Sequence, residues 1–177
     1  MDVKPDKIKM IVGLGNPGKE YESTYHNVGF LFINHLTDKR SSKIKSFEYA
    51  RADDIIFIKP LTYMNESGKA VFEAMKYFAI KSDEILLVHD DVDITPGEYK
   101  FSFGGGSAGH KGVESIIKYL GTKNFWRLRI GIAKYKLREE KKVRVKAEKF
   151  VLKNITKEDL KKINLAFDRA SGELLGQ

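Results

Sequence analysis

The sequence predicts a single α/β domain in which helices cover a mixed β-sheet. Two observations point to this class. Short apolar runs typical of strands alternate along the chain with longer segments whose apolar residues recur at helical spacing. One run, residues 85–88, is continuously apolar, as in a strand that is buried on both faces of a sheet. A chain of 177 residues suffices for one sizeable core and is short for two, so residues 1–177 are expected to form one domain.

The first half of the chain is expected to contain three strands and two helices. Residues 9–14 are apolar and end in glycines, as a short buried strand does. After a polar loop, the apolar residues of segment 26–36 fall on one face of a helix. Two strands, 47–51 and 54–59, surround a polar pair, and helical spacing resumes over residues 67–78.

The second half is expected to continue the alternation. Residues 85–88 form the buried strand, and residues 98–103 and 127–133 are further strands. Residues 113–120 have helical spacing. The last helix is expected to begin at Thr156, because a threonine followed closely by two acidic residues is a favourable helix start. The resulting order of strands and helices favours a mixed sheet with helices on it.

The composition excludes several classes of protein. Hydrophobic residues make up 42% of the chain and charged residues 32%, which argues against disorder of the whole chain. The longest apolar runs are only a few residues, whereas roughly 20 are needed to cross a bilayer. Cysteine is absent, which excludes disulfides and thiolate chemistry and favours a cytoplasmic location. Residues 1–6 lack the apolar run of a signal peptide, so no leader is expected.

The net charge of +8 is concentrated in one segment. Residues 134–162 hold 12 basic and 5 acidic side chains, whereas residues 1–133 are nearly balanced. A local positive field attracts polyanions, of which nucleic acid is the commonest in a cytoplasm. A solvated, lysine-rich surface would produce the same pattern, and on charge alone this simpler interpretation is favoured.

Two glycine-rich loops approach known nucleotide-binding motifs. Residues 13–18 satisfy G-x-G-x-x-G after a strand, but the dinucleotide fingerprint needs a helix that begins inside the motif, and a polar loop delays the helix here. A dinucleotide-binding enzyme is therefore a weak alternative. Residues 104–112 come close to a P-loop, but a histidine replaces its lysine. Such a loop can approach a phosphate through its backbone, or it can be a plain flexible turn.

Polar groups follow the buried strand 85–88, where open α/β sheets usually place their sites. His89-Asp90-Asp91-Val92-Asp93 could hold a divalent metal. Alternation along an extended chain, however, points Asp90 away from His89 and Asp91, which splits the cluster and weakens the metal interpretation. The competing interpretation is a single carboxylate that orients a histidine from another loop.

Among the four histidines, His26 is the better candidate for a general base. It precedes a helix whose dipole favours the neutral imidazole, which is the form that accepts a proton. His35 lies within a helix. His89 and His110 adjoin strand and loop ends and could be structural.

Four ordered motifs resemble the signatures of bacterial peptidyl-tRNA hydrolases. They comprise residues 13–29, residues 59–68, residues 89–97 together with the glycine loop 104–112, and residues 125–132. The similarity runs from about residue 8 to about residue 152 and continues more weakly into the final helix. Four motifs at family spacing are far more specific than any one of them.

The resemblance implies a single-domain, three-layer α/β/α fold with a mixed central sheet. It implies an esterase that acts on peptidyl-tRNA released prematurely from ribosomes and cuts the ester between the peptide and the 3′ ribose. The partners expected on this basis are the tRNA acceptor end and the peptide, with no membrane. The family is usually monomeric and needs no metal or cofactor.

The resemblance also implies roles for individual residues. His26 would be the base that activates water, and Asp90 would bond its other ring nitrogen and fix the tautomer. Asn16 and Asn65 would bind the peptide carbonyl or steady the oxyanion, and Asn16 would help to spare unblocked aminoacyl-tRNA. Arg129, with Arg127 as a second candidate, would meet tRNA phosphate. The full set of implied substrate-binding residues is Tyr21, Tyr63, Met64, Asn65, Lys111 and Arg129.

Two positions depart from the family pattern. Lys111 stands where most relatives carry asparagine, and because lysine cannot accept a hydrogen bond, a phosphate contact is the substitute hypothesis. Ser102 stands where relatives often carry a basic phosphate-clamping residue. Lys100 or the basic segment 134–146 could compensate, although that segment could equally be a solvated strand pair. An inactive RNA-binding member of the same fold is a further alternative, against which the intact set of implied catalytic residues argues.

Overall fold

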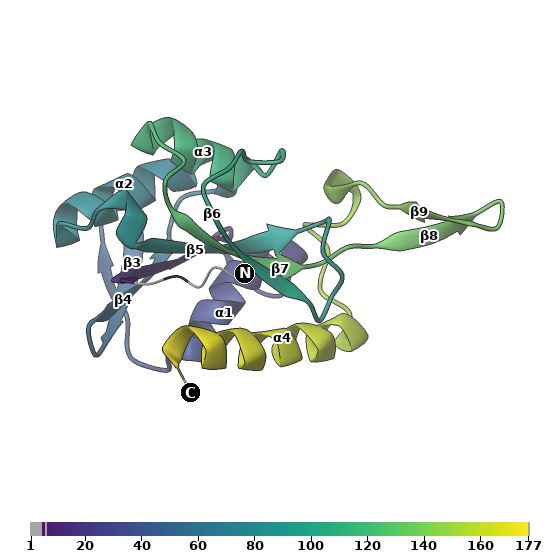
Figure 1. The fold of residues 1–177 in the computed structure, drawn as a ribbon, viewed down its shortest axis with the longest axis horizontal. Coiled ribbons are helices and arrows are strands. Elements are labelled where there is room, and N and C mark those ends of the chain that lie inside the picture. Colours follow the sequence, from purple (N-terminus) through teal and green to yellow (C-terminus); the bar gives the residue numbers. More distant parts are fainter. Residues whose placement is uncertain (1–4, 6, 177) are drawn as a thin grey trace.

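A seven-stranded mixed sheet, in the order β2-β3-β4-β1-β5-β7-β6, runs through the molecule (Figure 1). The ladders that join β4, β1, β5 and β7 are parallel, and the ladders that add β3, β2 and β6 are antiparallel. The strands of this sheet are β1 (Met10–Gly13), β2 (Ser42–Ile44), β3 (Phe47–Ala52), β4 (Ile55–Pro60), β5 (Ile85–Asp91), β6 (Tyr99–Phe103) and β7 (Trp126–Gly131).

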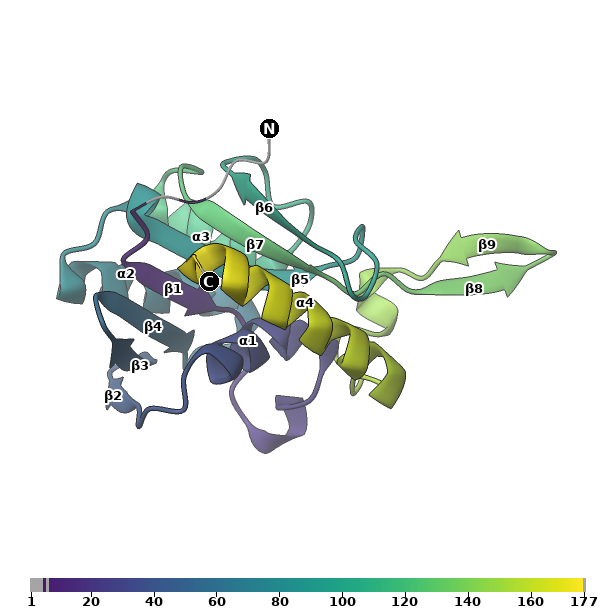
Figure 2. The same cartoon turned by 60° about the horizontal axis from the view of Figure 1, so that its bottom comes forward.

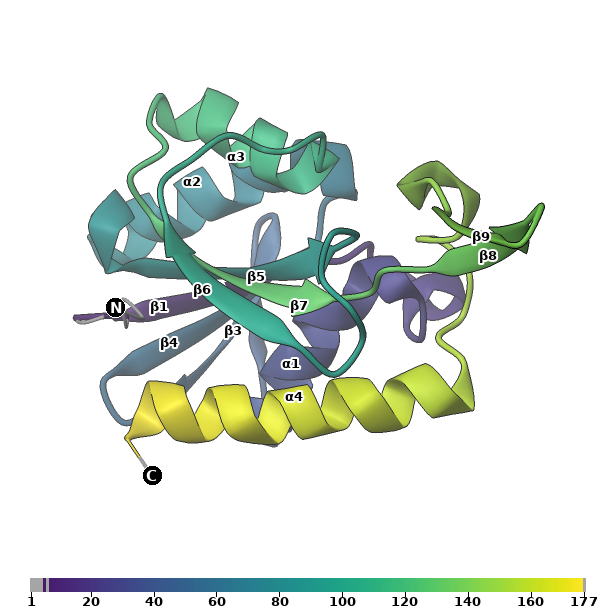
Figure 3. The ribbon, with the colours of Figure 1, turned by 45° about the vertical axis from the view of Figure 1, so that its right-hand side comes forward.

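Helices cover both faces of the sheet and give three layers (Figure 3). On the face that carries α1 and α4, Phe32 and Phe167 belong to one buried cluster, and on the face of α2 and α3 a second cluster includes Val71 and Ile116. The predicted three-layer α/β/α fold with a mixed central sheet is therefore confirmed. The helices are α1 (Val28–Leu36), α2 (Ser67–Phe78), α3 (Lys111–Leu120) and α4 (Lys157–Leu175), with 3-10 turns at Lys19–Tyr21, Tyr25–Asn27, Met64–Glu66, Ser82–Glu84 and Ala147–Lys149.

Strand β5 is longer than the apolar run that predicts it. It pairs with β7 up to Asp91, which lies opposite Gly131, so the ladder continues through the polar residues. All seven residues of β5 are buried. His89 and Asp90 are therefore held by sheet hydrogen bonds at the end of a central strand, rather than carried on the loop that follows it.

Most other element bounds agree with the sequence to within two residues. The helix expected from residue 26 begins at Val28, after the 3-10 turn Tyr25–Asn27. Strand β2 was not predicted, because its three residues lack an apolar alternation and lie at an exposed edge of the sheet. Thr156 caps α4 as expected, since its Oγ1 accepts the N–H of Asp159.

The basic segment 134–146 forms a strand pair that stands apart from the main sheet. Strands β8 (Tyr135–Arg138) and β9 (Lys141–Arg144) pair antiparallel with each other, and all eight residues are exposed. The hairpin projects from the body of the molecule (Figure 2). The sequence had left a solvated strand pair open as one of two interpretations.

The computed structural model describes residue 5 and residues 7–176. In that part of the chain, no helix has both the length and the apolar character needed to cross a membrane. Most of the first six residues, on which the expectation of no leader rests, lie outside the described part.

Candidate active site

A cleft of about 700 Å³ opens where the parallel strands end. Its walls come from the loops after β1 and β4, the end of β5, the glycine loop that leads into α3, and the segment that follows β9. Open α/β sheets place their ligands at this edge, because the carboxyl ends of parallel strands meet there. Eight of the nine residues that the sequence nominated line this cleft: Asn16, Tyr21, His26, Tyr63, Met64, Asn65, Asp90 and Lys111.

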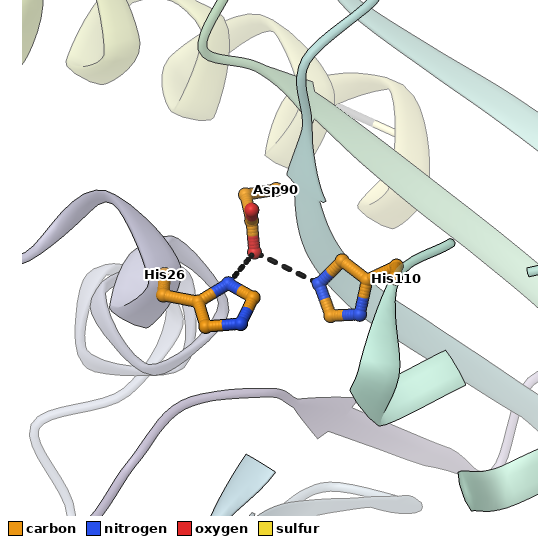
Figure 4. Close-up of side chains that lie close together, drawn as sticks. All are labelled: His26, Asp90 and His110. Carbon is orange, nitrogen blue, oxygen red and sulfur yellow. Dashed lines mark hydrogen bonds and ion pairs between the residues drawn. The ribbon is translucent and has the colours of Figure 1, made fainter. Parts of the chain in front are cut away.

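His26 and Asp90 are brought together from segments far apart in the sequence. The 3-10 turn that carries His26 is held in place because the His26 N–H donates to the carbonyl of Val151 at 2.8 Å. Nδ1 of His26 lies 2.8 Å from Oδ1 of Asp90 (Figure 4). A carboxylate only accepts hydrogen bonds, so Nδ1 carries the proton in the neutral ring and Nε2 is left as a proton acceptor in the cleft.

His110 binds the same carboxylate oxygen, which was not expected from the sequence. Its Nε2 lies 2.9 Å from Oδ1 of Asp90, and its ring lies 4.9 Å from that of His26 (Figure 4). Its Nδ1 accepts the N–H of Gly112 at 3.1 Å and so caps α3. Both ring nitrogens are thereby assigned, with the proton on Nε2. In the sequence, His110 is recognisable only as a histidine just before a predicted helix, and this pattern does not show that it shares a carboxylate with His26.

The electrostatics of the site depend on the buried carboxylate of Asp90. Burial alone would raise the pKa of Asp90, but the two imidazole rings outweigh burial and hold that pKa well below its ordinary value. Burial likewise lowers the pKa of His26, yet the Asp90 carboxylate more than offsets it, so the pKa of His26 is raised; the nearby charge of Lys111 opposes this rise. Asp90 is thus a permanent anion beside a histidine that can take up a proton.

His89 is a neutral neighbour of this pair. Burial, with a contribution from His110, lowers the pKa of His89 to about 3. Its Nδ1 donates to the carbonyl oxygen of Asp90 at 2.7 Å. Among the described residues its buried Nε2 has no hydrogen-bond partner. His89 therefore carries no charge at neutral pH.

The other two carboxylates of the acidic cluster are engaged by arginines rather than by His26. Asp91 pairs with Nε of Arg129 at 2.7 Å, and Asp93 pairs with Arg144. The Asp90 carboxylate bonds His26 and His110 while Asp91 bonds Arg129, which agrees with the predicted separation of Asp90 from Asp91. A carboxylate that orients a histidine from another loop describes this geometry better than a cluster of three acids.

A metal ion is geometrically conceivable at one place in the described part of the chain. Ligand atoms of His26, Asp90 and His110 lie within 4.8 Å of one another. In the arrangement observed, however, both rings direct an N–H at the carboxylate, and a metal would have to displace both protons. Hydrogen bonding accounts for the cluster, and a metal-free site remains a prediction.

The amide of Asn16 is held in one orientation. Asn16 is buried, and its Oδ1 accepts the N–H of Met64 at 2.8 Å, while its backbone exchanges two hydrogen bonds of 2.9 Å with the side chain of Asn27. Because Oδ1 is engaged, the side chain offers its Nδ2–H groups to the cleft as donors. Asn65 follows Met64 in the same 3-10 turn and is exposed.

Two tyrosines form an aromatic wall of the cleft. Tyr21 and Tyr63 pack edge to face with ring centroids 6.4 Å apart. Tyr63 is 55% exposed and lines the cleft, so its side chain is accessible to a ligand. Met64, which follows it, is buried.

Of the two basic residues expected to bind substrate, one lines the cleft and the other lies outside it. Lys111 is exposed at the first position of α3 and lines the cleft. Arg129 lies on β7 outside the cleft lining and is opposite Lys100 in the β6–β7 ladder, so these two cations share one face of the sheet.

Arg127 does not fit the role considered for it. Its side chain is buried, and its guanidinium donates to the carbonyls of Gly104, Gly105 and Gly106, at 2.6 Å for Gly105 and 2.8 Å for Gly106. The expectation of a phosphate contact at Arg127 is therefore wrong. This arginine fixes the glycine loop that carries His110 instead.

The first glycine motif serves packing rather than nucleotide binding. A Cβ on Gly13 would lie 2.3 Å from the carbonyl oxygen of Gly29, so glycine is required where α1 crosses β1. No helix begins between Gly13 and Gly18, and the motif has no helix N-terminus to offer a pyrophosphate. This geometry argues against the dinucleotide alternative.

Comparisons with known proteins agree with this architecture. A model of the family described as peptidyl-tRNA hydrolase matches residues 10–175. A peptidyl-tRNA hydrolase of Aquifex aeolicus is 42% identical over 172 residues, covering 92% of this chain and 86% of the relative. One from Neisseria gonorrhoeae is 48% identical over 134 residues, covering 71% and 70%. The crystal structure of peptidyl-tRNA hydrolase from Acinetobacter baumannii superimposes with a TM-score of 0.80 at 33% identity, covering 97% of this chain and 90% of that one.

Proposed function

The chain belongs to the peptidyl-tRNA hydrolase family and is an enzyme that hydrolyses peptidyl-tRNA, and we propose that His26 activates the water that attacks the ester. The observation that supports this role is the 2.8 Å contact between Nδ1 of His26 and Asp90, which leaves Nε2 free in the cleft. A base with one nitrogen bound to a buried carboxylate and the other open to substrate has the geometry that proton abstraction needs.

In the proposed reaction, Nε2 of His26 takes a proton from water as the water oxygen bonds to the ester carbonyl carbon. Asp90 stabilises the imidazolium that forms. The bond to the ribose 3′ oxygen then breaks, and the proton on Nε2 passes to that oxygen. The products are a free peptide carboxyl and the tRNA. His110 does not exchange protons in this scheme, because both of its nitrogens are already bonded; it positions Asp90.

Asn16 is proposed to bind the peptide next to the reacting ester. Its Nδ2–H groups can donate to a carbonyl oxygen or to the oxyanion, and Asn65 lies nearby with a second amide. A blocked α-amino group brings an acyl carbonyl that accepts such a bond. A free α-ammonium group only donates, and it would face a donor. This difference would spare ordinary aminoacyl-tRNA.

The tRNA is proposed to lie on the side of the tyrosines and the β6–β7 cations. The exposed ring of Tyr63, with Tyr21 beside it, can stack on a terminal base. Arg129 and Lys100 lie side by side and would meet phosphate. Lys100 would then replace the basic residue that is missing at Ser102. We further propose that the enzyme acts as a monomer in the cytoplasm.

The proposed function is tested with a matched pair of substrates, N-acetyl-aminoacyl-tRNA and the same aminoacyl-tRNA without the acetyl group, in the presence of a chelator. We expect chelator-resistant cleavage of the blocked substrate only. Loss of cleavage on chelation would overturn the metal-free mechanism, and equal cleavage of both substrates would overturn the role of Asn16. Binding of tRNA without any cleavage would favour the inactive RNA-binding alternative.

The charge of Lys111 is expected to influence the pH dependence of the reaction. This charge lowers the pKa of His26, and the base must be neutral to act. Replacing Lys111 by asparagine should therefore raise the pKa of His26, leave more of it protonated at a given pH, and move the acid limb of the kcat/KM profile to higher pH. The Lys111→Arg variant keeps the charge and is the control. An acid limb that moves equally in both variants, or in neither, would contradict this electrostatic role.

A further inference from the structure

The hairpin β8–β9 buries almost nothing against the rest of the molecule. Residues 135–144 are all exposed, including Tyr135 at 51% and Leu137 at 75%. A two-stranded hairpin alone is marginally stable in water, and this one adds no side chain from either strand to the buried core. Stabilising the fold is therefore not a sufficient explanation for it.

The base of the hairpin is nevertheless held firmly at the rim of the cleft. Lys134, just before β8, forms an ion pair with Asp159 in the first turn of α4. Arg144, at the end of β9, pairs with Asp93, which lines the cleft, and the N–H of Val145 donates to the carbonyl of Lys134 at 2.8 Å. The next residue, Lys146, lines the cleft itself. The hairpin is thus continuous with the wall of the active site.

Counted with its base, the hairpin is strongly cationic, and residues 135–143 beyond the base hold four basic and two acidic side chains. Residues 134–146 contain seven basic and two acidic side chains. In the described part of the chain, no carboxylate lies within ion-pairing distance of four of these cations: Lys136, Arg138, Lys141 and Lys142. Register places three of them, Lys136, Arg138 and Lys141, on one face of the hairpin. Like charges gathered in this way repel one another unless an external anion lies against them.

The size of the cleft determines which part of the substrate reaches the hairpin. A cleft of about 700 Å³ has the volume of a small-molecule site, which is enough for a terminal nucleotide and the last residues of a peptide. The rest of the tRNA has to lie outside, against the rim. Peptides vary in charge, whereas every tRNA brings a regular array of phosphates.

We propose that the β8–β9 hairpin is an arm that binds the sugar-phosphate backbone of the tRNA outside the active-site cleft. The inference rests on the proposed function, since it requires the ester to occupy the cleft at the base of the arm. The exposed cations would contact phosphates and contribute affinity and salt dependence without sequence preference. The arm would supplement the β6–β7 cations, Lys100 and Arg129.

The test compares two variants with the same change in charge. The arm variant carries Lys136→Gln, Arg138→Gln, Lys141→Gln and Lys142→Gln. The control variant carries Lys39→Gln, Arg40→Gln, Lys43→Gln and Lys45→Gln, four exposed residues at or beside β2, at the opposite edge of the sheet. Each protein is assayed for kcat/KM on N-acetyl-aminoacyl-tRNA over a range of salt concentrations, for the Kd of deacylated tRNA, and for cleavage of the same N-acetyl-aminoacyl ester on a CCA trinucleotide.

For the arm variant, we expect kcat/KM on the full tRNA to fall by about tenfold or more at low salt, and the slope of log kcat/KM against log salt to become shallower by roughly 2–4. The Kd for deacylated tRNA should rise in parallel, and cleavage of the trinucleotide ester should persist, because that substrate does not reach the arm. The control variant should behave as the wild type does.

Two outcomes would overturn the proposal. If the arm and control variants changed kcat/KM and the tRNA Kd equally, the hairpin cations would have no specific role in binding tRNA and would be part of a solvated surface. An equal loss on the trinucleotide ester would place its action inside the cleft, on the peptide or on catalysis. Failure of the proposed function is recognised separately: the wild type would then cleave neither substrate, while the tRNA Kd would still report on the arm.

Discussion

Replacing His26 by alanine is expected to lower kcat on N-acetyl-aminoacyl-tRNA by about 10²–10⁴-fold, the usual contribution of a positioned general base. Within residues 7–176, His26 is the one side chain bonded to Asp90 that keeps a free ring nitrogen in the cleft, and the variant loses it. KM should change far less than kcat, because the tyrosines and cations proposed to bind tRNA are untouched. Steady-state kinetics on the blocked substrate measures both parameters.

His35→Ala is the matched control for this substitution. His35 is exposed on α1, away from the cleft lining, and its Nε2 faces Asp168 on α4. It should retain the wild-type kcat. A His26→Ala enzyme with nearly full kcat would rule out His26 as the base, and the neighbouring histidines would then have to be reconsidered.

Replacing Asp90 by asparagine is expected to lower kcat by up to roughly 10⁴-fold, by analogy with a triad histidine that loses its orienting carboxylate. An amide is nearly the same size as a carboxylate, but it is neutral and carries donors of its own. It cannot stabilise an imidazolium on His26, and its –NH₂ group offers a donor where both histidine rings already donate.

The pH profile of the Asp90→Asn variant shows whether activity is lost because His26 is no longer oriented or because His26 is protonated. Asp90 raises the pKa of His26, so its removal should lower that pKa and move the acid limb of kcat/KM to lower pH. The activity that remains should therefore persist to lower pH than in the wild type, although it is much smaller. An acid limb that moves to higher pH would contradict the charge relation between the two residues.

Asp91→Asn is the control for the neighbouring carboxylate. Asp91 is the next residue of β5, but it pairs with Arg129 rather than with a histidine. Its replacement should act mainly on KM, through the arginine proposed to contact tRNA, and should retain most of kcat. Equal losses of kcat in the two variants would mean that Asp90 has no special role.

Local patterns of the sequence were sufficient for the architecture. The continuous apolar run 85–88 predicts a strand that is buried on both faces, and the helical spacing of residues 67–78 predicts a helix that is buried on one face. Both patterns involve only residues that are close together in the sequence. The fold class and the order of most elements therefore followed without coordinates, whereas the short edge strand β2 did not. The family motifs added His26 and Asp90 as a pair and implied their hydrogen bond, which the folded chain shows at 2.8 Å.

The tertiary structure decided which polar groups meet. His26 and His110 lie 64 and 20 residues from the carboxylate that they share, and no periodicity relates such distances. Arg127 and Arg129 are two residues apart on one strand, yet one is buried beneath the glycine loop and the other is paired at the surface. The basic segment predicted a positive field, but its exposure, its anchoring at the cleft and its free cations depend on chain packing. Sequence by itself determined the elements because their signals are local, whereas the shared carboxylate and the anchoring of the hairpin at the cleft depend on long-range contacts that only the folded chain defines.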